Sequence, residues 1–155
     1  MKFLDTARRK TLASCLTLMI ATSAPLPALA GTPQTDANVK FVQTFLEKIR
    51  EATFQRHDPK AIREIGERYM RPDYIQHSDG MKPGREGYIG SMVGLAQGGG
   101  PAAGPMPDIK DLYWVADGDK VVWVSAVQLP GRDKPEFMFN MMRIQDGKIA
   151  EHWGK

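Results

Sequence analysis

Apolar residues recur at helical spacing in three segments of the N-terminal half of the chain. The first pattern predicts a helix over 36–52. The second predicts a helix over 58–71, because Asp58 is a good N-cap and proline follows it at the first helical position. The third predicts a helix over 83–95, weakened by its glycines.

The C-terminal half has the shorter periods and turn residues of strands. Its two hairpin signals are Asp117-Gly118-Asp119 and Asp146-Gly147. The strands that they join are 112–116 with 120–128, and 137–145 with 148–153. A further extended segment is predicted over 73–78, and the Gly- and Pro-rich residues 97–107 predict a loop that either borders a site or acts as a spacer. The order of elements predicts an α+β domain with helices on one face of an antiparallel sheet.

The Asp146-Gly147 turn predicts the register of the last hairpin. Counting outward from the turn, Met142 opposes Glu151 and Asn140 opposes Trp153, so these four share a face. Ile144 and Ile149 lie on that face too, and the other face carries Phe137, Phe139, Met141, Arg143, Ala150 and His152. Glu151 and His152 are therefore predicted to serve different sides of the sheet, unless a bulge exchanges the two sets locally.

The second sheet face is also apolar, and this affects the expected assembly. An apolar sheet face that helices do not cover is commonly buried against another molecule. We expect Phe137, Phe139 and Met141 to lie at the interface of a homodimer. Burial of the same residues by loops or by the C-terminal residues is the alternative.

The first 30 of the 155 residues have the pattern of a secretory signal peptide. A basic start is followed by the uncharged stretch 11–24 and by the small-residue site Ala28-Leu29-Ala30. We predict a leader over 1–30, a polar tether over 31–37 and one domain over 38–155. The mature protein is expected to be exported, periplasmic or secreted, and without a membrane anchor.

Charge and cysteine content change once the leader is set aside. The chain has 21 Lys and Arg and 18 Asp and Glu, and the leader holds four of the cations and Asp5. The remainder carries 17 of each, a balance that gives no reason to expect a nucleic-acid partner. Cys15 lies in the leader, so no disulfide or thiolate nucleophile is expected in the mature protein.

Three segments together resemble a known family. They are Tyr74-Ile75-Gln76-His77 with Gly84–Ile89 after it, Ala116–Val121, and Arg143–Trp153, which is the most specific. Over residues 38–155 the chain resembles the SnoaL-like polyketide cyclases of the NTF2-like superfamily. The resemblance implies a cone in which three N-terminal helices pack on a curved antiparallel sheet around a deep pocket. It also implies acid–base chemistry without a metal or organic cofactor.

The chain departs from the family pattern at the position that matters most for that chemistry. Family members usually place an aspartate three positions before the arginine of the C-terminal segment, and this chain has Asn140. An aldol-type cyclase needs a base for the carbon-bound proton and donors for the enolate oxygen. Asparagine serves as a donor but not as the base. The chain given also ends at Lys155, without the further carboxylate that relatives carry after the tryptophan.

His77 is the first candidate for the acid–base residue, because imidazole titrates near neutral pH. Asp73 shares a face with it in an extended segment and is a candidate to orient the ring. Glu151 is the candidate substitute base if an apolar pocket raises its pKa, and an ion pair with Arg143 or Lys148 is the alternative. A backbone-bonded structural histidine is the alternative for His77, and a structural role is expected for His152.

The expected pocket has polar and apolar parts. Asn140 is the predicted substrate donor, and the apolar wall is assigned to Trp153, Tyr74, Tyr88, Met92, Met142 and Trp123, each of which also fits an ordinary core. Three histidines without clustered spacing predict no metal site. The sequence thus supports two functions: a cofactor-free cyclase or isomerase for a hydrophobic carbonyl compound, or a module that binds a hydrophobic small molecule without turnover.

Overall fold

A computed structural model describes residues 31–99, 107–129 and 131–155 of the chain. Its helices are α1 (Pro33–Arg50), α2 (Pro59–Tyr69) and α3 (Gly84–Ala96), and a π-helical turn, η1 (Glu51–Gln55), extends α1. Its strands are β1 (Met70–Gln76), β2 (Asp108–Asp117), β3 (Lys120–Gln128), β4 (Glu136–Gln145) and β5 (Lys148–Gly154). The predicted leader 1–30 and most of the predicted loop 97–107 lie outside the described residues.

The helix starts follow from capping residues. Asp58 caps α2 as predicted, and its carboxylate accepts a hydrogen bond from the Ala61 N–H at 3.0 Å. The tether predicted over 31–37 is wrong for most of its length, because α1 already begins at Pro33. Thr32 supplies the cap that the prediction missed, and its hydroxyl accepts from the Thr35 N–H at 3.2 Å.

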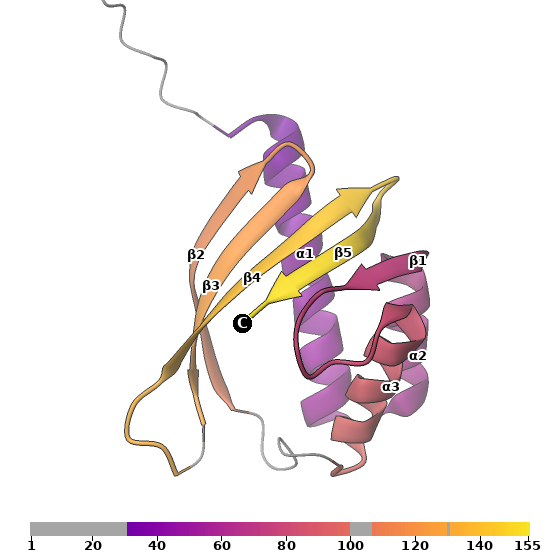
Figure 1. Cartoon of the computed structure of the whole chain (residues 1–155), viewed down its shortest axis with the longest axis vertical. Coiled ribbons are helices and arrows are strands. Elements are labelled where there is room, and N and C mark those ends of the chain that lie inside the picture. The colour runs from indigo at the N-terminus through magenta and orange to yellow at the C-terminus, as the bar shows by residue number, and fades with distance from the viewer. Residues whose placement is uncertain (1–30, 100–106, 130) are drawn as a thin grey trace, which may run out of the picture.

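The five strands form one mixed sheet in the order β1-β5-β4-β3-β2 (Figure 1). Strands β2 to β5 pair antiparallel as predicted, whereas β1 pairs parallel with β5. In Figure 1, α1 runs behind the fanned strands and α2 and α3 lie at the β1 end of the sheet. The α+β prediction is confirmed, with one parallel pair added to the antiparallel sheet.

The last hairpin departs from the predicted register after its first two pairs. Its turn is the predicted one, with positive φ at Asp146 and Gly147 as a two-residue turn of this kind requires. Ile144 pairs with Ile149, but Arg143 then pairs with Glu151, so Ala150 is an extra residue on β5. This bulge exchanges the two faces of β5 beyond it.

The predicted face assignments for the end of the chain are therefore wrong. Met142 pairs with His152 and Met141 with Trp153, so His152 shares the inner face with Asn140 and Met142. Glu151 and Trp153 lie on the outer face with Met141.

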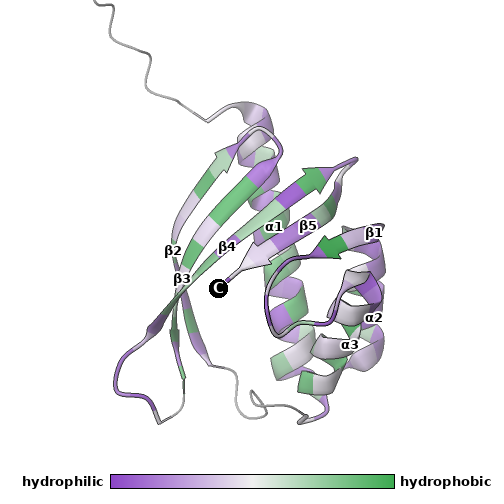
Figure 2. Cartoon of the chain, in the orientation of Figure 1, coloured by the Kyte–Doolittle hydropathy of each residue, from purple (hydrophilic) through white to green (hydrophobic). Residues whose placement is uncertain are grey.

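The core lies between the helices and the inner sheet face. Its fully buried side chains include Phe45 of α1, Ile62 of α2, Ile89 of α3 and Met142 of β4. Hydropathy alternates along the strands in Figure 2, as expected where two sheet faces meet different surroundings. The outer face exposes large apolar side chains, with Tyr113 at 70% and Phe137 and Phe139 at 60% each. Within the described residues, no helix has the length and apolar character needed to cross a membrane.

A glycine sets the distance between α2 and α3. A Cβ added at Gly66 would lie 2.5 Å from the Ile89 side chain, which is fully buried. We expect Gly66→Ala to lower the free energy of unfolding by about 1–3 kcal/mol, since overpacking outweighs the better helix propensity of alanine. Gly90 of α3 is the matched control, because nothing lies within 4 Å of its added Cβ. Gly90→Ala should raise stability by up to about 1 kcal/mol in urea titrations. Equal shifts for the two variants would contradict the close contact.

Candidate functional site

A cavity of about 180 Å³ lies between the helices and the inner face of the sheet. Most of its wall is apolar, contributed by Leu46, Met81, Tyr88, Met92, Ile109, Trp123, Val127, Met138 and Met142. Its polar lining consists of Arg50, Ser125, Asn140 and His152. The hydrophobic residues come from both layers of the fold, so the cavity is the interior of the cone.

One end of the cavity carries a chain of polar side chains. His152 Nε2 lies 3.2 Å from Asn140 Oδ1, and His152 Nδ1 lies 3.0 Å from Gln76 Oε1. The Tyr74 hydroxyl donates to the same Gln76 oxygen at 2.8 Å. The parallel pairing of β1 with β5 creates this contact, because it sets Gln76 directly beside His152. Asn140 is thereby held in place by a network of side chains from three strands, β1, β4 and β5.

The ionisation state of His152 follows from its surroundings. Burial lowers the pKa of His152 to about 4, with a smaller contribution from His77, so the ring is neutral at pH 7. A neutral imidazole has one N–H and one lone pair, yet this ring faces two amide oxygens. It therefore donates to one amide, and the other must turn its NH2 toward the ring. Burial also raises the pKa values of Tyr74 and Tyr88, which keeps their hydroxyls protonated.

The remaining polar groups of the lining satisfy one another. Arg50 binds Asp111 with two hydrogen bonds, at 3.1 and 3.3 Å. Ser125 donates to Asp111 Oδ1 at 2.7 Å and is itself buried. The carboxylate of Asp111 is thus held by three donors. Asn140, by contrast, has one side-chain hydrogen bond among the described residues, the one with His152.

His77 and Glu151 do come together, but on the outer face of the sheet. His77 Nε2 lies 2.9 Å from Glu151 Oε2, and the His77 ring stacks on Trp153 with centroids 4.5 Å apart. Arg143 donates from Nε to Glu151 Oε1 at 2.7 Å, which is the ion pair considered above. The hydrogen bonds from His77 and Arg143 hold the pKa of Glu151 below its usual range, so the raised pKa considered for it is wrong.

Two more sequence assignments need correction. Asp73 does not orient His77, because its carboxylate accepts a hydrogen bond from Arg71 at 2.8 Å. The hydrogen-bond partner of the His77 ring is Glu151. Trp153 lines an outer groove of about 450 Å³ with His77 and Phe139 rather than the cone cavity. Asn140, Tyr88, Met142, Met92 and Trp123 do lie on the cavity wall, and Tyr74 supports it through Gln76. A binding or catalytic role for any of them stays a prediction.

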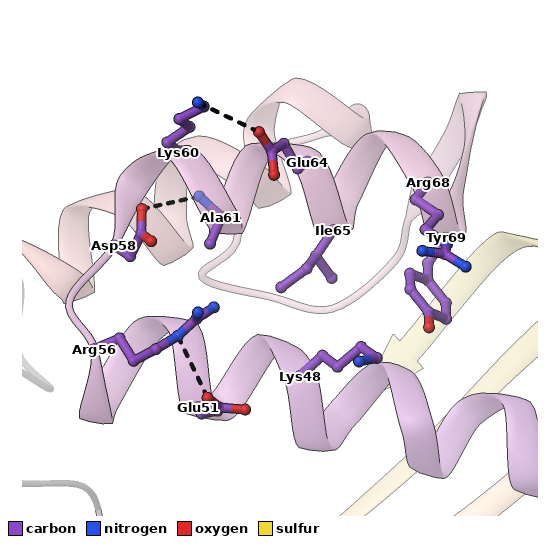
Figure 3. A pocket seen from close by; sticks show the side chains of 10 residues that line it. All are labelled: Lys48, Glu51, Arg56, Asp58, Lys60, Ala61, Glu64, Ile65, Arg68 and Tyr69. Carbon is purple, nitrogen blue, oxygen red and sulfur yellow. Dashed lines mark hydrogen bonds and ion pairs between the residues drawn. The ribbon is translucent and has the colours of Figure 1, made fainter.

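A larger groove of about 590 Å³ runs between α1 and α2 (Figure 3). Charged side chains dominate its lining, and several are paired within it, Arg56 with Glu51 at 3.4 Å and Lys60 with Glu64 at 3.9 Å. Asp58 is occupied by capping α2. Exposed pairs of this kind are typical of a solvated surface, so this groove is a weaker candidate than the cavity.

The fold is NTF2-like. Similar solved structures include an NTF2-like protein of unknown function from Mesorhizobium loti, with 18% identity and a TM-score of 0.56 over 81% of this chain and 94% of that one. A protein from Jannaschia sp. CCS1 assigned to the SnoaL-like polyketide cyclases has 16% identity and a TM-score of 0.54, over 83% and 90%. TsrD from Streptomyces laurentii has 20% identity and a TM-score of 0.51, over 75% and 87%.

At these identities the similarity establishes the fold and leaves the activity open. No protein-family model matches the sequence. No curated relative matches it either. The function must therefore be argued from the cavity itself.

Proposed function

We propose that the protein binds a compact, largely apolar carbonyl compound in the cone cavity, as a SnoaL-like small-molecule module. The observation that carries the proposal is the composition of the cavity wall, which is apolar except for a few polar groups. One of them, Asn140, is hydrogen-bonded to the buried, neutral His152. Sites for small molecules typically combine an apolar lining with a few fixed polar groups.

The size of the cavity limits the ligand. Its volume of about 180 Å³ is close to the roughly 150 Å³ of an engineered apolar cavity that binds benzene. Pockets for drug-sized molecules start at about 300 Å³. The ligand is accordingly a single small ring or a short chain, and not a polycyclic polyketide.

A second candidate function is cofactor-free acid–base chemistry of the cyclase or isomerase type on the same ligand. The observation that favours it is His152, an imidazole on the cavity wall that is neutral at pH 7 and connected to Asn140 and Gln76 through its two ring nitrogens. His152 replaces His77 in this role, since His77 lies on the other face of the sheet. Exchange of α-protons of a bound ketone for deuterium would distinguish turnover from binding alone.

The proposal also includes export and a homodimer. The signal-peptide pattern of residues 1–30 supports export. The exposed aromatic side chains of Tyr113, Phe137 and Phe139 on the outer sheet face support burial against a second copy.

One native mass spectrum of the protein, expressed with its leader and recovered from the exporting host, tests these parts together. We expect a mass of two copies of residues 31–155, with added mass that disappears on denaturation and matches a small carbonyl compound. An intact leader would contradict export, and a monomer would contradict the dimer. A protein without added mass that also fails to bind cyclohexanone by NMR titration would contradict the binding function.

A further inference from the structure

Trp123 of β3 has a buried donor without a partner. The residue is 3% exposed, and its indole Nε1 makes no hydrogen bond with any described residue. An indole N–H donates and cannot accept, and no tautomer removes the donor. Buried polar groups are nearly always paired, and an unpaired one calls for an explanation.

The position of Trp123 supplies that explanation. Its ring is part of the cavity wall, and the register of β3 and β4 sets it directly opposite Asn140. Side chains that face each other across antiparallel strands lie about 5 Å apart at Cβ. When His152 donates from Nε2 to Asn140 Oδ1 at 3.2 Å, Gln76 is the amide that turns its NH2 toward the ring, and Asn140 Nδ2–H is left for a ligand. Two N–H donors therefore belong to neighbouring side chains at one end of the cavity.

We propose that Trp123 Nε1–H and Asn140 Nδ2–H bind one acceptor oxygen of the ligand together. A carbonyl oxygen has two lone pairs and accepts both donors, and an enolate oxygen accepts them more strongly. The pair selects ketones and their enolates over hydrocarbons of the same shape. This inference rests on the proposed function, because it names the group by which the cavity recognises its ligand.

The indole is well fixed for such a role. Its ring stacks on Trp114 at a centroid distance of 5.5 Å and an interplanar angle of 13°. On its other side, the His152 ring lies 6.2 Å away at 20°. A donor that cannot rotate away loses little freedom when it binds a ligand.

The experiment compares two probes of nearly equal shape, cyclohexanone and methylenecyclohexane, which lacks the acceptor oxygen. The indole N–H signals of the three tryptophans are followed by proton–nitrogen NMR during titration with each probe. We expect cyclohexanone to move the Trp123 signal downfield and methylenecyclohexane to leave it nearly unchanged. Trp123→Phe should weaken cyclohexanone binding about fivefold to tenfold and leave methylenecyclohexane binding unchanged.

Trp153→Phe is the matched control, because it removes an indole that lines the outer groove and is not part of the cavity lining. It should leave the preference for the ketone intact, and thermal unfolding verifies that each variant is folded. If cyclohexanone binds without moving the Trp123 signal, or if Trp123→Phe weakens both probes equally, the inference is wrong and the proposed function stands. If neither probe binds the wild-type protein, the proposed function fails together with the inference.

Discussion

The free energy of unfolding is expected to fall by about 3 kcal/mol as the pH is lowered from 6.5 to 4, because of His152. Burial lowers the pKa of this histidine to about 4 in the folded protein, while the unfolded chain titrates near 6.5. Between these values the unfolded state binds the proton and the folded state does not, so acid favours unfolding. The loss begins near pH 6.5 and is complete just below pH 4.

Urea titrations at pH 7.5, 6.5, 5.5 and 4.5 measure this slope. His152→Gln removes the titrating group and should flatten the curve above pH 4.5, although it also weakens the network at neutral pH. His57→Gln is the matched control, because it removes an exposed histidine outside the His152 network. The carboxylates with lowered pKa values, such as Glu151 and Asp119, change the free energy of unfolding mainly at lower pH, where carboxylates begin to protonate. A slope that survives in His152→Gln would show that another group is responsible.

The local elements were predictable because each depends on neighbouring residues. The Asp58 cap and the Asp146-Gly147 turn are read from a few positions, and both occur where the sequence placed them. The one helix start that was missed, at Pro33, depends on Thr32, a weaker signal than Asp58 because threonine is also common in loops and strands.

The candidate site was less predictable because it depends on one extra residue in β5. An ideal two-residue hairpin leaves no reason to place a bulge at Ala150, and without it Glu151 faces the cavity and His152 does not. The parallel pairing of β1 with β5 is equally invisible, since it joins residues more than seventy positions apart. The sequence therefore gives no reason to single out Gln76, which is a hydrogen-bond partner of His152.

Asn140→Asp should convert the cavity into a base-containing site. The new carboxylate would lie where Asn140 Oδ1 now lies, 3.2 Å from His152 Nε2, in apolar surroundings that favour proton transfer. A positioned general base typically contributes a factor of about 100 to 10,000. We expect α-proton exchange of cyclohexanone in deuterated water to rise at least about 100-fold over the wild-type protein. Gln145→Glu is the matched control, because it adds the same charge to β4 at an exposed position.

The same substitution makes a second prediction that does not depend on any ligand. A carboxylate beside His152 favours the charged imidazole and should raise its pKa, so the acid-induced loss of stability between pH 6.5 and 4 should shrink. If the slope shrinks and exchange does not rise, Asn140 and His152 are in contact but the cavity does not hold a ketone productively. If neither changes, the contact between Asn140 and His152 is wrong, and with it the polar end of the site. The two measurements together therefore separate an error in the geometry of the cavity from an error in its chemistry.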